Sequence, residues 1–246
     1  NIKGLSFQDR FIDILSDPNN LFIPRHVNAG KIIDDNIIMH NGLKVVNKCY
    51  YGDFSDVLVT NKGCHEPAEE RMFQHVLNDI NDGGLMIELG SYWAFYSMWF
   101  NSMIKNAVNY CIEPDINSLN IGEKNCEINN INCHFIHGVT NKLPINGLES
   151  ISAPEINLKD FINDNAINFV DLLHSDIQGS ELNLLTDISI LLKEKKIKYL
   201  FISTHSNDIH YKCIDFLKQH DYRIIESSDF ENQTFCFDGI IVACQK

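Results

Sequence analysis

Two acidic residues on neighbouring apolar runs have the spacing of a nucleotide-type binding site. Glu88 lies two residues before Gly90, and Glu113 ends the next apolar run about 25 residues further on. Glycine allows the backbone to turn tightly and to approach a ligand closely. An acid at the end of the second strand can accept hydrogen bonds from both hydroxyls of a ribose. We therefore predict that the cofactor is bound by Glu88, Gly90, Ser91, Tyr92 and Glu113.

The glycine content of this loop restricts the class of ligand. A dinucleotide fingerprint has the pattern Gly-x-Gly-x-x-Gly, followed by an acid about 20 residues later. Of the three glycines, only Gly90 is present. A dinucleotide needs the missing glycines to admit its pyrophosphate, which disfavours NAD and FAD. A nucleoside ligand without phosphates does not need them, and S-adenosylmethionine (SAM) is such a ligand.

From residue 85 onward, apolar runs alternate regularly with helix-compatible segments. Strands are predicted at 85–89, 108–112, 133–136, 167–174 and 197–203. Helices are predicted at 93–104, 116–129, 180–192 and 209–220, with a less regular stretch at 140–165. Two strands joined by a polar loop, 222–226 and 235–244, follow. This pattern predicts an α/β fold with a mainly parallel sheet and an antiparallel end, the layout of the Rossmann-like, seven-stranded class I methyltransferase fold.

Residues 1–82 lack this alternation and are predicted to form an N-terminal mixed α/β cap on a domain spanning 83–246. The cap is expected to contain a helix at 7–15, a hairpin turn at Asn41-Gly42 and a helix at 66–80. Tyr50, Tyr51 and the segment 65–69 are candidates for contacts with the acceptor substrate. Trp93, just after the glycine loop, is either a core residue or a wall of the cofactor pocket.

Three motifs together resemble the FkbM family of methyltransferases. They are Glu88-Leu-Gly-Ser-Tyr-Trp-Ala-Phe-Tyr-Ser97, Glu113-Pro114 and Asp176-Ile-Gln-Gly-Ser-Glu181. The similarity spans about 66–244, and the third motif is its most specific part. The segment Leu158-Lys-Asp-Phe161 departs from the family pattern at Lys159. The resemblance implies a SAM-dependent O-methyltransferase that acts on a hydroxyl of a sugar, a glycan or a related small molecule.

Asp176 and His205 are the predicted catalytic residues, because both follow predicted strands at the edge of the sheet where such folds bind ligands. Either side chain could act as a general base for an acceptor hydroxyl. Alternatively, Asp176, His205 and His174 could hold a divalent metal. No diagnostic ligand spacing supports a metal, so none is predicted. Val139, after the third strand, is expected by fold analogy to lie beside the adenine.

Two other functions remain open at this point: a catalytically inactive, methyltransferase-like binding module, and an NAD-dependent oxidoreductase. The net charge of −13 and the pI near 5.1 argue against a nucleic-acid acceptor, because phosphate backbones would be repelled.

The eight cysteines have no Cys-x-x-Cys pair, which favours free thiols and a reducing, cytoplasmic compartment. Neither a membrane span nor a secretory signal is predicted. Because the sequence begins with Asn1, we expect a processed product, a trimmed chain or one module of a larger polypeptide.

Overall fold

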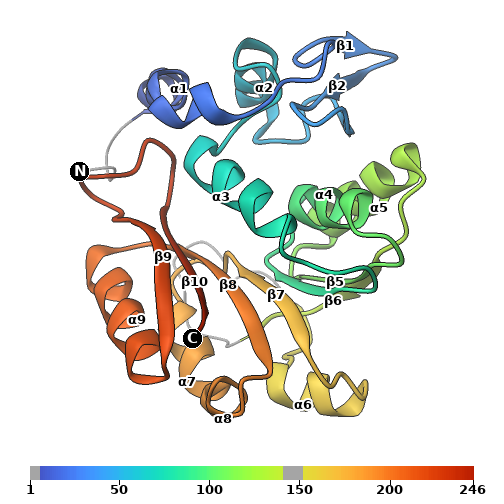
Figure 1. Cartoon of the computed structure of the whole chain (residues 1–246). Coiled ribbons are helices and arrows are strands. Elements are labelled where there is room, and N and C mark those ends of the chain that lie inside the picture. The colour runs from blue at the N-terminus through green and yellow to red at the C-terminus, as the bar shows by residue number, and fades with distance from the viewer. Residues whose placement is uncertain (1–5, 141–151) are drawn as a thin grey trace.

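The computed structural model describes residues 6–140 and 152–246, and a seven-stranded sheet lies at its centre (Figure 1). The strands are β4 (Leu85–Leu89), β5 (Val108–Glu113), β6 (His134–His137), β7 (Val170–Ser175), β8 (Ile197–Thr204), β9 (Tyr222–Ser228) and β10 (Gly239–Gln245). Their order is β6-β5-β4-β7-β8-β10-β9. All neighbouring strands are parallel except that β10 runs antiparallel to both β8 and β9. The predicted fold class is confirmed.

Helices cover both faces of the sheet, as Figure 1 shows. One face carries α3 (Pro67–Leu77), α4 (Phe95–Met103) and α5 (Ile116–Asn129). The other face carries α6 (Leu158–Asp164), α7 (Glu181–Asp187), α8 (Ser189–Lys193) and α9 (Asn207–Gln219). Strand residues alternate between the two faces, so Met86 joins one core cluster while Ile87 and Leu89 join the other. The single helix predicted at 180–192 is instead α7 and α8, divided at Ile188. Residues 141–151 of the less regular stretch lie outside the described residues.

The N-terminal elements attach to α5 through side-chain amides. These elements are α1 (Phe7–Ser16), η1 (Pro18–Phe22), β1 (Ile32–Ile33), β2 (Asn36–Ile38), β3 (Lys44–Val46), η2 (Gly52–Ser55) and α2 (Asp56–Thr60). β2 and β3 form the predicted hairpin, with Gly42 at a φ of +89°. Asn129 of α5 accepts a hydrogen bond from the Lys44 N–H and donates one to the Lys44 carbonyl, at 2.9 and 2.7 Å. An amide side chain thus extends the edge of β3 as another strand would.

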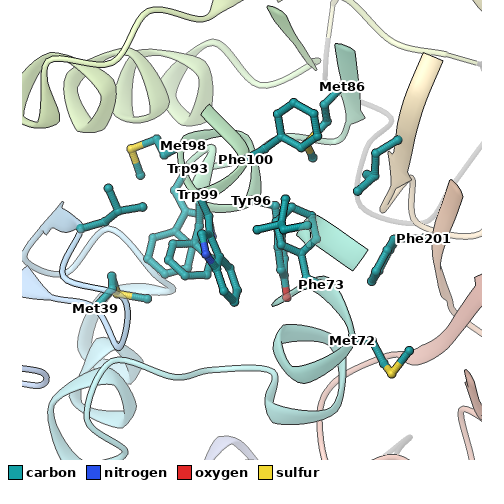
Figure 2. Close-up of a cluster of buried hydrophobic side chains, with 14 of the residues drawn as sticks. Met39, Met72, Phe73, Met86, Trp93, Tyr96, Met98, Trp99, Phe100 and Phe201 are labelled. Atoms are coloured by element: carbon teal, nitrogen blue, oxygen red, sulfur yellow. The ribbon is translucent and has the colours of Figure 1, made fainter. Parts of the chain in front are cut away.

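One hydrophobic cluster joins the N-terminal elements to the sheet (Figure 2). It runs from Met39, beside β2, through Trp99 of α4 and Phe73 of α3 to Phe201 of β8. The Phe73 ring lies 5.2 Å from that of Trp99 and 5.5 Å from that of Phe201, measured between centroids. Removal of the N-terminal elements would therefore expose apolar surface on the helices that cover the sheet.

The cysteines agree with the expectation of free thiols. All eight cysteines are free thiols, and all are buried except Cys133, which is half-buried. Within residues 6–140 and 152–246, every helix is too short or too polar to cross a lipid bilayer.

Candidate functional site

The loop after β4 crosses directly over the backbone that follows β7. Gly90 has a φ of +70°, and the N–H groups of Gly90 and Ser91 both donate to the Ile112 carbonyl, at 2.9 and 3.2 Å. A Cβ atom on Gly90 would lie 1.9 Å from the carbonyl oxygen of Asp176. Only glycine suits both this conformation and this close approach. The predicted loop residue and one predicted catalytic residue are therefore in backbone contact.

The residues after Gly90 offer a buried hydroxyl and an anchored ring. Ser91 is 2% exposed, and its Oγ atom has no hydrogen-bond partner within the described parts of the chain. Tyr92 adopts a φ of +46°, and its hydroxyl accepts a hydrogen bond from the Tyr51 N–H at 3.0 Å. Its ring packs on Tyr51, with centroids 5.5 Å apart. Ser91 Oγ is thus a place where a polar ligand atom would satisfy a buried group.

Trp93 is a core residue. Its side chain is 4% exposed and stacks on Tyr50 and Phe95, with centroid distances of 5.1 and 5.5 Å. Its backbone carbonyl accepts a hydrogen bond from Asn125 of α5. Of the two readings that the sequence left open for Trp93, packing is the one that these contacts support.

Glu113 lies at the tip of β5 and braces the glycine loop. Its Oε2 accepts a hydrogen bond from the Tyr92 N–H at 2.8 Å, and its Oε1 accepts one from the Asp115 N–H at 2.9 Å. Burial raises the pKa of Glu113 to about 7, although these two N–H donors favour the ionised form. Asp115 caps α5 by accepting from the Asn117 and Ser118 N–H groups. Glu113 is therefore not needed as the helix cap, and each of its oxygens retains a lone pair for a ribose hydroxyl.

Glu88 points to the face of the sheet that α4 covers. Its Oε2 accepts a hydrogen bond from the Ser97 N–H at 3.1 Å, and its side chain is 2% exposed. Burial raises its pKa to about 7, while neighbouring His174 and the Ser97 hydrogen bond act in the opposite direction. Through this hydrogen bond, Glu88 attaches α4 to the sheet.

Replacement of Glu88 by glutamine is expected to remove a pH-dependent loss of stability. Folded Glu88 keeps its proton up to about pH 7, whereas an unfolded glutamate loses it near 4.5. The folded state binds more protons in that window, so the free energy of unfolding falls as pH rises through it, by about 3 kcal/mol at most. Glutamine can still accept from the Ser97 N–H, so the variant should match the wild type at pH 4.5 and exceed it at pH 7.5.

Urea denaturation at the two pH values checks this, with Glu123→Gln on the exposed side of α5 as the matched control. If the free energy of unfolding fell equally in Glu88→Gln and in the wild type between pH 4.5 and pH 7.5, the raised pKa of Glu88 would be refuted.

His205, the second predicted catalytic residue, contacts Asp176 and also Asp238, which was not predicted from the sequence. The Nε2 atom of His205 lies 3.3 Å from Asp176 Oδ1 and 3.1 Å from Asp238 Oδ1. His205 follows β8, and Asp238 immediately precedes β10, whose first residue Gly239 pairs with Thr204. The antiparallel insertion of β10 beside β8 is what brings the two side chains together.

A fully buried acid fixes the other side of the His205 ring. Glu181, the first residue of α7, lies with its Oε1 atom 2.8 Å from His205 Nδ1, and the same oxygen accepts from the Gly179 N–H. Burial opposes a charge on His205, yet the surrounding carboxylates of Asp238, Asp176 and Glu181 hold its pKa well above the usual value. Burial raises the pKa of Asp238 to about 6, whereas His205 holds that of Asp176 below its usual value against the effect of burial.

Acids at the start of α3 are buried rather than exposed at the helix end. Glu70 accepts hydrogen bonds from the N–H groups of His65 and Glu66, and its carboxylate lies between the rings of His65 and His40, at 2.7 and 3.0 Å. Burial opposes the charge on Glu70, but the two histidines hold its pKa well below the usual value. Glu70 therefore caps α3 and joins it to the N-terminal elements.

Glu69, one position earlier, pairs with the sheet. Its Oε1 atom lies 2.6 Å from His174 Nε2, and burial raises the pKa of Glu69 and lowers that of His174. Burial therefore favours the neutral form of each group, and the two side chains share one hydrogen bond. His174 thus faces α3, on the side of Glu69, and the metal-ligand set that included it receives no support from this contact.

Val139 lies just beyond β6. Its N–H donates to the Pro154 carbonyl and its carbonyl accepts from the Ile156 N–H, both at 2.9 Å, which forms a bridge to the segment before α6. The preceding residue, Gly138, donates its N–H to the Glu113 carbonyl. Val139 therefore sits next to the backbone of the residue expected to bind ribose.

An open groove of about 560 Å³ lies among the N-terminal elements, with Tyr51 in its wall. Its lining residues are Phe7, Gln8, Phe11, Tyr51, Asp53, Phe54 and Asp56. The Tyr51 ring is half exposed and lies 5.6 Å from that of Phe237, next to Asp238. Partial burial and the charges of Asp176 and Asp238 raise the pKa of Tyr51. An aromatic surface thus continues from the groove to the carboxylates.

Comparison with known proteins identifies the family. The model of the methyltransferase FkbM domain matches residues 74–224, and no curated protein matches the chain. Among solved structures, a putative rRNA methylase from Clostridium thermocellum is 10% identical over 72% of this chain and 94% of that one, with a TM-score of 0.51. Precorrin-6y C5,15-methyltransferase from Geobacter metallireducens is 13% identical over 72% and 88%, with a TM-score of 0.48.

M. capricolum TrmK in complex with S-adenosyl-homocysteine is 18% identical over 71% of this chain and 68% of that one, with a TM-score of 0.43. At 10% identity, the likeness to the Clostridium thermocellum protein establishes the fold alone. The family model covers more than half of the chain and includes Glu88, Gly90, Glu113 and Asp176. The chain therefore belongs to the FkbM methyltransferase family and is a SAM-dependent methyltransferase.

Proposed function

We propose that the enzyme transfers a methyl group from SAM to a hydroxyl of a sugar or of a glycan-linked group. One observation carries this proposal: the Tyr51 ring packs on Phe237, the residue before Asp238, and lies near enough to Asp176 and Asp238 for their charges to raise its pKa. Aromatic rings pack on the apolar faces of ligands, while a few placed polar groups fix their orientation. A sugar ring has both an apolar face and hydroxyls at its rim, so it suits this combination.

The residues around Gly90 fit SAM. Ser91 Oγ is buried and lacks a partner among the described residues, and the carboxylate of Glu113 can still accept from ribose hydroxyls. We assign the methionine part to the loop from Gly90 to Tyr92, the ribose to Glu113, and the adenine to the neighbourhood of Val139. When bound, SAM supplies an activated methyl group for in-line displacement, so the protein contributes mainly proximity and alignment.

The carboxylates of Asp176 and Asp238 are the proposed acceptors for the proton of the attacking hydroxyl. His205 lies between Asp176 and Asp238, whose carboxylates help to hold its pKa well above the usual value, and its part is to orient these two side chains. Asp238 is the better base of the two because its pKa is raised to about 6. A correctly placed base contributes about 10²–10⁴-fold to the rate.

We further propose that residues 1–82 act as a cap and residues 83–246 as the methyltransferase domain. The cap contributes Tyr51, which is bonded to Tyr92 of the glycine loop. Tyr51, the proposed acceptor-binding residue, is therefore joined to the loop that we assign to the cofactor by one hydrogen bond, from its backbone N–H to Tyr92.

Two measurements test the function. Calorimetric titration should detect S-adenosylhomocysteine binding and no NADH binding. Transfer of radiolabelled methyl from SAM should then be measured on monosaccharides, oligosaccharides, tRNA and rRNA. Label on a sugar hydroxyl is the expected outcome. Binding without transfer to any acceptor would favour the inactive module, and label on RNA would overturn the proposed substrate class.

Replacement of Tyr51 by alanine should raise the KM for a sugar acceptor about tenfold, because one stacking ring is lost. The backbone N–H that bonds Tyr92 is kept, so S-adenosylhomocysteine affinity should stay unchanged. Phe169→Ala, at an exposed phenylalanine just before β7, is the control and should leave both quantities at the wild-type values. An unchanged KM in Tyr51→Ala would remove Tyr51 from the acceptor site.

A further inference from the structure

A compact set of nitrogen and oxygen donors converges on one point beyond the ends of β7 and β8. One donor atom from each of Asp176, His205 and Asp238 lies within 4.8 Å of the others. All three side chains are half-buried, so the point is shielded yet reachable from solvent. Imidazole nitrogen and carboxylate oxygen are ligands of several divalent first-row metals.

The distances match those between ligands of one metal ion. Metal–nitrogen and metal–oxygen bonds are about 2.1 Å long, so neighbouring ligands are about 3.0 Å apart at octahedral angles and about 3.4 Å apart at tetrahedral ones. His205 Nε2 lies 3.3 Å from Asp176 Oδ1 and 3.1 Å from Asp238 Oδ1. These two pairs therefore have the separation of neighbouring ligands, and the third pair, Asp176 and Asp238, lies within 4.8 Å.

The orientation of His205 supplies an independent sign of a metal ligand. Its buried Nε2 atom makes no hydrogen bond of good geometry within the described residues, although two carboxylates are close. A metal ion bound by this nitrogen and both carboxylates would take the place of the Nε2 proton. The opposite nitrogen, Nδ1, is held by Glu181, which is fully buried. A carboxylate on the far nitrogen is the usual way in which proteins orient a metal-binding histidine.

We propose that Asp176, His205 and Asp238 bind a divalent metal ion, with Glu181 as the positioning residue for His205. Three protein ligands leave coordination positions open for water or for an acceptor hydroxyl. A hydroxyl bound there would have a lowered pKa, which reduces the basicity required of the protein. This catalytic role rests on the proposed function, whereas the site itself rests on the geometry alone.

The test is metal binding by the whole chain, with two probes. Mn²⁺ accepts both imidazole and carboxylate, and electron paramagnetic resonance counts the free ion; Zn²⁺ is titrated by calorimetry. One ion per chain is expected for the wild type. Asp238→Asn and Asp176→Asn should weaken binding about tenfold or more, and so should Glu181→Gln, because loss of such an orienting carboxylate costs about 10–100-fold. Asp215→Asn, on the exposed side of α9, removes the same charge elsewhere and should bind as the wild type does.

Binding of S-adenosylhomocysteine, measured in the same samples, separates this inference from the proposed function. If the wild type binds S-adenosylhomocysteine but neither metal, the metal site is refuted and the function stands. If it binds metal at this site but transfers methyl to no acceptor, the site stands and the function falls. Equal metal affinity in the wild type and in both aspartate variants would also overturn the inference.

Discussion

Alanine at position 90 is expected to destabilise the protein by about 3 kcal/mol or more and to abolish binding of S-adenosylhomocysteine. The new Cβ atom would lie 1.9 Å from the Asp176 carbonyl oxygen, which is a backbone atom and cannot swing aside. The strand tips of β4 and β7 would have to separate, and both the loop that follows Gly90 and the side chain of Asp176 would move. Urea denaturation and calorimetric titration measure the two effects.

Gly83→Ala separates the two causes of this effect. Gly83 has a φ of +81°, similar to that of Gly90, but a Cβ atom there would meet nothing within 4 Å. The control therefore carries only the conformational strain of a left-handed alanine, about 1–2 kcal/mol. If Gly83→Ala and Gly90→Ala lowered the free energy of unfolding by the same amount, close approach to Asp176 would not be the reason for glycine at position 90.

S-adenosylhomocysteine should bind about tenfold more weakly at pH 6 than at pH 8, because the ribose hydroxyls need an ionised Glu113. Burial raises the pKa of that residue to about 7. Near pH 6 about nine-tenths of the free protein carries the proton on Glu113, and near pH 8 about one-tenth does. Binding of the ionised form alone therefore strengthens as pH rises through 7. Titration calorimetry at the two pH values gives the ratio.

Glu113→Gln should weaken binding by about 10–100-fold at pH 8, because hydrogen bonds to a charged group are worth about 1.5–3 kcal/mol each. The variant should also lose the tenfold change with pH. A pH dependence that persisted in Glu113→Gln would assign the titration to another group. An affinity equal to that of the wild type would place the ribose elsewhere.

The order and type of the sheet elements could be predicted because apolar runs and helical segments alternate strictly after residue 85. The same reasoning brought together Gly90, Glu113, Asp176 and His205, since the carboxyl ends of parallel strands share one edge. These features depend on local patterns, which a single sequence displays.

Features that depend on contacts between distant residues could not be predicted. Asp238 was hidden inside the predicted strand 235–244, although Asp-Gly is a turn signal that could have ended the strand there. Glu69 and Glu70 lie near the start of the helix predicted at 66–80, and only tertiary packing pairs them with His174, His65 and His40. The break between α7 and α8 had no glycine or proline to announce it.

The placement of β10 between β8 and β9 has a consequence for synthesis on the ribosome. A nascent chain that has not yet reached Gly239 leaves both flanking strands with open amide edges, and such edges recruit strands from other molecules. Asp238 directly precedes this strand, so the proposed base reaches its place beside His205 only when β10 docks. Docking of this strand is therefore the step at which chaperones would have most to protect.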